Sequence, residues 1–506
     1  MIGAGSGAAG AGSNTGCAVC QTAEVTESRR EARRPAEGPP PLTTAEIVAV
    51  TGGRLIRPSD RPVRGGAVDS RQIERGDLFV ALPGERTDGH RFAPMAVRSG
   101  AGAALIREAS PELLAAADEA DAGLVAVPDT LLGLHAVAAA WRGRFSPLVV
   151  GVTGSIAKTS TKEAIAAVLA EGYRTLKSEG NQNNEVGLPL TVLRLGPEHE
   201  AAVLEMGMYV GGEIAQLAAI ARPRIGVVTA VREVHLSRIG TIEAVSRAKA
   251  ELIEALPDDG VAVLNADDPR VLAMGSRTKA RSITYGFGDD ADVRALDVES
   301  AGLAGMRFTL AVRGGRMEMA IPALGRHGIQ NGLAAVATGL AAGLDLDAIA
   351  AGLVAGWQAP HRDQIVRTGQ LTILDDSYNA SPASVLSALE LLATLPGRHV
   401  AVLGEMLELG EAHDRGHREV GEAAARQVEL LVVVGLGAAA IVNGAAALGD
   451  SVVAVPDREG ALAVLRERLR PGDTVLVKAS RGAGLDLIVE SLAGGNGGRR
   501  AVEENN

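Results

Sequence analysis

The 506-residue chain has only two cysteines and few aromatic residues. Cys17 and Cys20 form a single C-x-x-C motif, and no second pair completes a four-cysteine zinc site. We interpret this pair as part of a disordered leader, so disulfides do not hold the fold. Aromatic residues make up 2% of the chain, so its cores must be built from Val, Leu, Ile and Ala.

The chain also lacks a long basic block, and its net charge is −11. This balance argues against a nucleic-acid surface, although a small phosphate-bearing substrate needs only a local positive site. Residues 1–40 lack the basic start and apolar core of a secretory signal. We therefore expect a cytoplasmic protein that binds no nucleic acid.

One apolar run, residues 430–444, imitates a membrane span. Its glycines and Asn443 interrupt it, and a buried strand, a turn at Gly435–Gly437 and a helix explain it better. We expect no stable insertion into a membrane.

A chain of this length exceeds the ~250–300 residues that one hydrophobic core usually supports. Apolar strands alternate with helices, and 63 glycines suit many strand–helix turns, which predicts α/β domains with mostly parallel sheets. Expected strands cover residues 77–82, 148–152, 201–205, 225–229, 261–265, 371–375, 399–403, 430–434 and 474–477. We divide the chain into a leader (1–41), a small mixed α/β domain (42–145), a central mononucleotide-binding domain (146–359), a C-terminal α/β domain (360–492) and a tail (493–506).

A phosphate-binding turn is predicted where the sequence GVTGSIAKTSTKE (151–163) comes just after the apolar residues 147–150. Backbone N–H groups and the positive end of the next helix would face the phosphates of ATP. Lys158 would reach the terminal phosphates, and the Thr159 hydroxyl would hold Mg²⁺. The predicted nucleotide-binding residues are Gly154, Ser155, Ile156, Ala157, Lys158, Thr159 and Ser160.

This turn departs from the usual phosphate-loop pattern, because Ala157 stands where a glycine is expected. At positive φ the methyl group would cost about 1 kcal/mol, whereas at negative φ the cost would be small. The bulky neighbour Ile156 favours negative φ. An ordinary strand–turn–helix connection is the alternative interpretation.

Three further residues follow strands, and ligands of open α/β sheets bind at the carboxyl ends of strands. Glu205 ends one strand and is a candidate metal ligand; His235 lies in the loop after another. Lys249 lies on the helix that follows this loop, where an exposed lysine is the ordinary expectation.

Two polar loops are candidates for ligand binding, with helix capping as the alternative. Residues 179–190 are rich in Asn and Glu, and residues 375–382 read DDSYNASP. Asp376 could accept hydrogen bonds from a ribose, while Tyr378 and Asn379 could orient a ligand. By spacing alone, Arg362 is an exposed arginine.

Taken together, these segments resemble the Mur ligases over about residues 42–490. No single motif decides this, but their order and spacing are specific. The segments DDSYN and NNE resemble the branch that adds D-alanyl-D-alanine rather than the branch that forms the tripeptide. The resemblance rests on residues 68–71, 76–90, 151–163, 179–190, 204–207, 234–236, 247–249, 325–331, 374–382, 402–410 and 477–481.

This resemblance implies three α/β domains, the last of them Rossmann-like, and an ATP-dependent peptide ligase of cytoplasmic peptidoglycan precursor synthesis. ATP would phosphorylate the free carboxylate of UDP-N-acetylmuramoyl-tripeptide, and the amine of D-alanyl-D-alanine would attack the acyl phosphate. This chemistry would depend on positioning the substrates and neutralising their charge more than on a nucleophile from the protein. We expect a monomer that uses ATP and Mg²⁺.

The resemblance also implies residue roles. Lys158, His235 and Lys249 would be catalytic, the last as a carbamate. Thr159, Glu205, His235 and Lys249 would bind Mg²⁺. Asn331 would meet adenine, Arg362 the terminal phosphate and Asp376 the ribose. The expected substrate-binding residues are Asp69, Ser70 and Arg71 for the UDP-sugar, Asn183 and Asn184 for the muramoyl peptide, and Tyr378 and Asn379 for the dipeptide.

Departures from the family's pattern occur at Ile156-Ala157, at Ser381, where Asn is common, and at residues 229–235, where an Asn-rich start is common. Two alternatives remain open: a related amide ligase with another acceptor, or a nucleotide-binding regulatory or scaffold protein that no longer turns over ATP. Retention of Lys158, Thr159, Glu205, His235 and Lys249 favours an enzyme.

Overall fold

A computed structural model describes residues 38–84, 87–232 and 239–494. Cys17, Cys20 and His235 lie outside these ranges, so the predictions made for them have no structural counterpart. In the described part of the chain, no helix is long and apolar enough to cross a membrane.

The first sheet has five strands in the order β1-β5-β4-β3-β2 and is parallel except where β1 pairs with β5. Alanine-rich helices α3 and α4 share a small core with one face of the sheet, whereas α2 and α5 contribute to a different core. The strands are β1 (Arg54–Arg57), β2 (Gly66–Ala67), β3 (Leu78–Val80), β4 (Ala103–Ile106) and β5 (Gly123–Ala126). The helices are α2 (Thr44–Thr51), α3 (Ala93–Arg98), α4 (Pro111–Ala120) and α5 (Thr130–Arg142).

The second sheet has nine strands in the order β14-β13-β12-β11-β10-β9-β6-β8-β7. Its strands are parallel from β7 to β12, and an antiparallel meander, β12 to β14, extends it. The strands are β6 (Leu148–Thr153), β7 (Thr175–Lys177), β8 (Ala201–Glu205), β9 (Ile225–Val228), β10 (Val261–Asn265), β11 (Arg281–Gly286), β12 (Val293–Ser300), β13 (Met306–Val312) and β14 (Gly315–Ile321).

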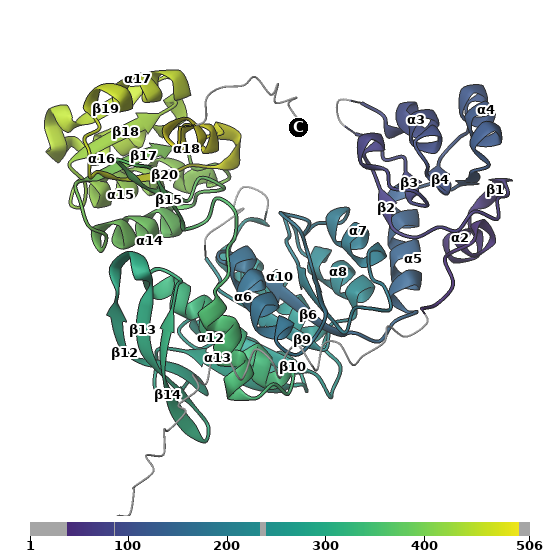
Figure 1. Ribbon diagram of the computed structural model, residues 1–506, viewed down its shortest axis with the longest axis horizontal. Coiled ribbons are helices and arrows are strands. Elements are labelled where there is room, and N and C mark those ends of the chain that lie inside the picture. Colours follow the sequence, from purple (N-terminus) through teal and green to yellow (C-terminus); the bar gives the residue numbers. More distant parts are fainter. Residues whose placement is uncertain (1–37, 85–86, 233–238, 495–506) are drawn as a thin grey trace, which may run out of the picture. The chain divides into compact units, whose positions relative to one another are not determined.

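Helices cover both faces of this sheet, as continuous apolar strands require. One face packs on α6, α12 and α13, which lie together in Figure 1. The other face packs on α8 and α10. The helices are α6 (Lys158–Ala170), α7 (Gly187–Leu193), α8 (Glu213–Ala221), α10 (Ile242–Glu254), α11 (Pro269–Leu272), α12 (Gly325–Ala341) and α13 (Leu346–Ala355).

Strand order places a ligand-binding position beside β6. After β6 the chain forms β7 and β8 on one side of that strand and then β9 on the other side. The loops at the ends of such neighbouring strands diverge and leave a crevice between them. The turn after β6 therefore lies where this fold binds ligands.

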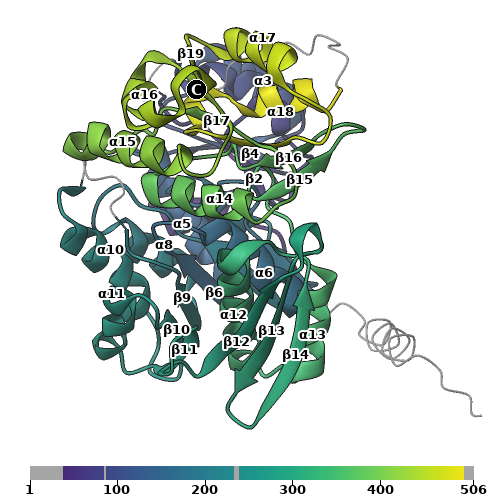
Figure 2. The same cartoon turned by 90° about the vertical axis from the view of Figure 1, so that its left-hand side faces the viewer.

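The third sheet has six strands in the order β15-β16-β20-β17-β18-β19, with only β15 antiparallel. Figure 2 shows α14 and α15 on one face and α17 and α18 on the other, in agreement with two separate cores. The strands are β15 (Gln364–Arg367), β16 (Thr372–Asp375), β17 (His399–Gly404), β18 (Leu430–Val434), β19 (Val452–Val455) and β20 (Thr474–Lys478). The helices are α14 (Pro382–Ala393), α15 (His413–Ala424), α16 (Ala439–Gly444), α17 (Arg458–Arg468) and α18 (Asp486–Leu492).

The predicted α/β fold class is confirmed, and the expected strands agree with the structure to within a few residues. The apolar run at 430–444 forms β18, a turn at Gly435 and α16, as predicted. The antiparallel meander β12–β14 was not predicted.

Candidate active site

The central feature is a cavity of about 420 Å³ lined by the turn after β6 and by the carboxyl ends of β8, β16 and β20. Predicted residues on its wall are Ser155, Ile156, Ala157, Lys158, Thr159, Ser160, Asn183, Asn184, Glu205, Lys249, Asn331, Arg362, Asp376, Tyr378 and Asn379. Asp69, Ser70, Arg71 and Gly154 are not part of this wall. The structure thus brings together most of the predicted nucleotide, metal and dipeptide residues.

Helix α6 begins without a side-chain cap, because its N-cap residue is Ala157. The first N–H groups of a helix have no partner within it, and its N-terminus carries partial positive charge. The start of α6 lines the cavity. These properties make it a site for an anion such as a phosphate group.

The turn before α6 is braced from outside. Ser155 Oγ accepts a hydrogen bond from the Arg232 N–H at 2.9 Å and donates one to the Arg232 carbonyl at 3.1 Å. Thr229 Oγ1 donates to the Ile156 carbonyl at 2.6 Å. Gly154 is required at its position, since a Cβ there would lie 1.8 Å from Thr229 Oγ1. The unusual segment after β9 therefore holds the turn in shape.

The expectation of negative φ at Ala157 is wrong. Its φ is +64°, in the left-handed region that favours glycine. The bulk of Ile156 did not decide the backbone conformation, because contacts from Thr229 and Arg232 hold the two residues that precede Ala157. The alanine methyl therefore carries the strain that a glycine would avoid.

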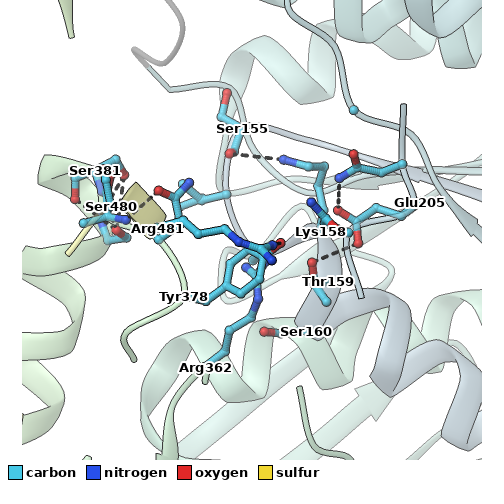
Figure 3. Close-up of a pocket in the computed structure, with 18 of the residues that line it drawn as sticks. Ser155, Lys158, Thr159, Ser160, Glu205, Arg362, Tyr378, Ser381, Ser480 and Arg481 are labelled. Atoms are coloured by element: carbon cyan, nitrogen blue, oxygen red, sulfur yellow. Dashed lines mark hydrogen bonds between the residues drawn. The ribbon is translucent and has the colours of Figure 1, made fainter. Parts of the chain in front are cut away.

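Two oxygen-bearing side chains meet beside the turn. Thr159 Oγ1 donates to Glu205 Oε2 at 2.8 Å (Figure 3). Asn183 Nδ2 donates to Glu205 Oε1, also at 2.8 Å. Glu205 is 1% exposed. A buried carboxylate and a hydroxyl are the hard oxygen donors that Mg²⁺ prefers, so this pair fits a metal site. Among the described residues no cluster of three His, Cys, Asp or Glu side chains could complete it.

Two lysines lie near this pair. Lys158 Nζ donates to the Gly154 carbonyl at 2.9 Å; loss of hydration lowers the pKa of Lys158, and the charge of Arg362 lowers it further, against the pull of Glu205. Lys249 is 2% exposed, so the ordinary expectation of a surface lysine is wrong. Burial lowers its pKa well below the usual range, and the Lys158 charge adds to this effect. Such a lysine favours the neutral amine.

The opposite wall of the cavity has internally paired charges. Lys478 Nζ contacts Asp376 Oδ2 at 2.6 Å, and both groups are buried. Burial raises the pKa of Asp376 to about 6, an effect that Lys478 opposes. His327 Nε2 contacts Asp363 Oδ2 at 3.0 Å. Although burial acts against it, this aspartate raises the pKa of His327.

One aromatic ring, that of Tyr378, contacts two arginines at this wall. The Arg362 guanidinium lies 4.2 Å from the Tyr378 ring centroid, and Figure 3 shows the two side by side. Arg481 Nη1 donates to the Tyr378 hydroxyl at 2.8 Å. Nearby Ser381 caps α14 and forms a capping box with Ser384, and Pro382 stands at the first helical position. Serine caps helices as well as asparagine does, so this departure from the family's pattern preserves the cap.

Three family models match the chain: the Mur ligase family catalytic domain over residues 63–142, the Mur ligase middle domain over 152–339 and the Mur ligase glutamate ligase domain over 361–481. The UDP-N-acetylmuramoyl-tripeptide–D-alanyl-D-alanine ligase of Mycobacterium tuberculosis (strain H37Rv) is 40% identical over 496 residues, covering 89% of this chain and 97% of the relative. The chain belongs to the Mur ligase family.

Further similar proteins support membership of the Mur ligases. The enzyme of the same name from Bacillus subtilis is 36% identical and covers 89% of this chain and 98% of its own. A MurF structure from Acinetobacter baumannii gives a TM-score of 0.81 at 28% identity, covering 91% of this chain and 100% of that one. The MurF ligase of Thermotoga maritima, solved with ADP, gives 0.75 at 29% identity over 86% and 98%.

Several cavity residues of this Mur ligase had no predicted role. Ser381, the N-cap of α14, and Ser384 and Ser387 on that helix line the cavity, and their spacing of three was a usable signal. Lys478 and Arg481 stood in a motif without an assigned function. For Lys249 a signal existed, because Val245 and Ile253 lie one turn away on either side and are both buried.

Proposed function

We propose that this Mur ligase joins D-alanyl-D-alanine to UDP-N-acetylmuramoyl-tripeptide with hydrolysis of ATP, in cytoplasmic peptidoglycan precursor synthesis. The observation that carries the proposal is the single cavity shared by the turn before α6 and the strand ends of the third sheet. Relatives that bear this ligase's name match the chain over almost their whole length. No observation favours either alternative function.

ATP is the energy source in this family, and the proposed contacts follow from the geometry. The uncapped start of α6 and Lys158 would face the phosphates, and Arg362 would neutralise the terminal phosphate. Asn331, which accepts a hydrogen bond from Thr161 at 2.9 Å, would contact adenine. Asp376 would accept from the ribose. The turn residues Gly154–Ser160 would enclose the polyphosphate.

Mg²⁺ would bind to Thr159 and Glu205, the oxygen pair at the carboxyl end of β8. Bound there, the ion would neutralise phosphate charge. We further propose His235 and a carbamate on Lys249 as ligands. Carbon dioxide adds to a neutral amine, one proton is released, and an N–C bond forms. The resulting carboxylate-like group suits a hard cation, whereas an ammonium would repel it.

In the proposed reaction, an oxygen of the tripeptide carboxylate attacks the terminal phosphorus of ATP, and ADP leaves. The dipeptide amine then attacks the carbonyl carbon of the acyl phosphate, loses a proton, and phosphate leaves. The chain would act by holding these groups in line and by balancing charge. Asp69, Ser70 and Arg71 would bind the UDP-sugar, Asn183 and Asn184 the muramoyl peptide, and Tyr378 and Asn379 the dipeptide.

We propose that the three sheets correspond to three domains at 42–145, 146–359 and 360–492, and that the enzyme is a cytoplasmic monomer. The decisive assay is phosphate release. It should require ATP, Mg²⁺, UDP-N-acetylmuramoyl-tripeptide and D-alanyl-D-alanine together. Equal turnover with single amino acids in place of the dipeptide would support a ligase with another acceptor, and no turnover at all would support a scaffold.

A further inference from the structure

D-alanyl-D-alanine has two charged ends, and only its amine takes part in the proposed bond formation. Its C-terminal carboxylate must also leave bulk water when the dipeptide binds. A carboxylate that loses hydration needs a cation with hydrogen-bond donors, and the fork of an arginine fits it in two parallel bonds. The cavity wall should therefore hold a cation for this group.

Most basic side chains on the wall are already engaged. Lys478 is buried against Asp376, and His327 is paired with Asp363. Lys158 bonds the backbone of its own turn, and Lys249 is buried beside it. These groups are occupied by partners or lie at the phosphate end of the cavity. Arg362 and Arg481 remain; both contact the Tyr378 ring, and Arg481 also bonds the Tyr378 hydroxyl.

Arg481 follows β20 and is exposed, and it lines the cavity. Among the described residues its side chain forms no salt bridge with a carboxylate and donates one hydrogen bond, to the Tyr378 hydroxyl at 2.8 Å, while its guanidinium lies 5.1 Å from the centroid of that ring. A guanidinium carries five N–H donors, so donors remain for a ligand. The tyrosine thus orients Arg481 without neutralising it.

The surroundings of Arg481 suit a small acceptor. Ser480 and Gly482 flank it in sequence and line the same wall. Ser480 Oγ accepts from the Leu407 N–H at 2.9 Å, which ties the loop after β17 to the end of β20. This loop adds apolar surface, because Leu407 and Leu409 also line the cavity. Short side chains beside an apolar edge leave room for methyl groups.

We propose that Arg481 binds the C-terminal carboxylate of the acceptor dipeptide, while Arg362, on the same tyrosine, faces the transferring phosphate. This assignment rests on the proposed function and adds a specificity determinant to it. Tyr378 contacts both guanidinium groups and so holds them in a fixed relation, which sets the distance between the carboxylate and the reacting end. The enzyme then selects acceptors with a free carboxylate at that distance from the amine.

The test compares D-alanyl-D-alanine with its C-terminal amide in the phosphate-release assay. Wild-type enzyme should show kcat/KM roughly 10- to 100-fold higher for the acid, the range expected for hydrogen bonds to a charged group. Arg481→Gln should lose a similar factor with the acid and almost nothing with the amide. Arg481→Lys should recover part of the loss. The KM for ATP should not change in either variant.

Arg458→Gln is the matched control. Arg458 donates to the Gly484 carbonyl at 3.2 Å behind the same segment and does not line the cavity. It should leave the preference for acid over amide intact. An equal loss on acid and amide in Arg481→Gln, or a wild-type enzyme indifferent to amidation, would overturn the assignment alone. Absence of dipeptide-dependent turnover in wild type would overturn the proposed function and this assignment with it.

Discussion

The two ends of the cavity differ in whether their charged groups are paired within the chain. At the central sheet, α6 starts without a cap, and the Glu205 carboxylate accepts from two neutral side chains, Thr159 and Asn183. At the third sheet, Lys478 pairs with Asp376, and Ser381 caps α14. The first end has donors and a carboxylate that a ligand and a metal would satisfy. The second end is satisfied by the chain itself, apart from its two arginines.

This difference separates stability from activity. Where charges already pair within the fold, removing one partner leaves the other buried and uncompensated. Where groups await a ligand, their removal costs little folding free energy but weakens binding of the transition state. Substitutions at the two ends should therefore change different measurements.

The largest expected effect is on folding, at Lys478. Lys478→Met should destabilise the protein by about 3–5 kcal/mol, because it leaves Asp376 buried without its cation. Denaturant unfolding checks this value. The double variant Lys478→Met with Asp376→Asn should recover part of the loss, since the remaining side chain is neutral. A double variant less stable than the single one would contradict this account of the pair.

At the other end, Lys158→Ala should leave folding nearly unchanged and reduce turnover. We expect a loss of at least ~10²-fold in kcat, the range seen when one group that stabilises transition-state charge is removed. Phosphate release and an unfolding curve on the same sample separate the two effects. Near-normal turnover would exclude Lys158 from phosphate binding.

Lys249→Ala should reduce activity by roughly 10- to 100-fold, as for other residues that support a metal site. Short carboxylates such as acetate should restore part of it, because they fill the space of the lost carbamate. Lys249→Glu should recover little, since its side chain is shorter than carbamyl-lysine. Carbon-13 NMR with labelled bicarbonate detects the carbamate directly. A bare ammonium in an active Mg–ATP complex would refute the assignment.

Sequence patterns located strand ends well but not the contacts between them. Glu205 ends β8 as predicted, because a short apolar run followed by a carboxylate clearly indicates a buried strand and its end. The pairing of Asp376 with Lys478 could not be predicted, since 102 residues separate them and the partner strand, β20, inserts between β16 and β17. The apolar residues one helical turn away from Lys249 predicted that it is buried, whereas the charge of a lysine side chain predicted that it is exposed.

The conformation of Ala157 was the clearest failure of local reasoning. Its neighbour Ile156 favoured negative φ, yet contacts from residues 229–232 impose +64°. Those contacts come from a segment more than 70 residues away, so no local pattern carried them. The strain is a property of the folded turn rather than of its sequence.

The smallest expected effect follows from that strain. Ala157→Gly should relieve about 1 kcal/mol, partly offset by the greater freedom of glycine in the unfolded chain, so stability should rise by up to ~1 kcal/mol. Contacts from residues 229–232 hold the turn in this conformation, so ATP affinity should change less than about threefold, which is under 1 kcal/mol. Denaturant unfolding and calorimetric titration with ATP measure the two quantities. Ala342→Gly, at φ −79° after α12, is the control and should destabilise by roughly 0.5–1 kcal/mol. A gain in ATP affinity without a gain in stability would show instead that the turn adopts its strained conformation only when nucleotide binds.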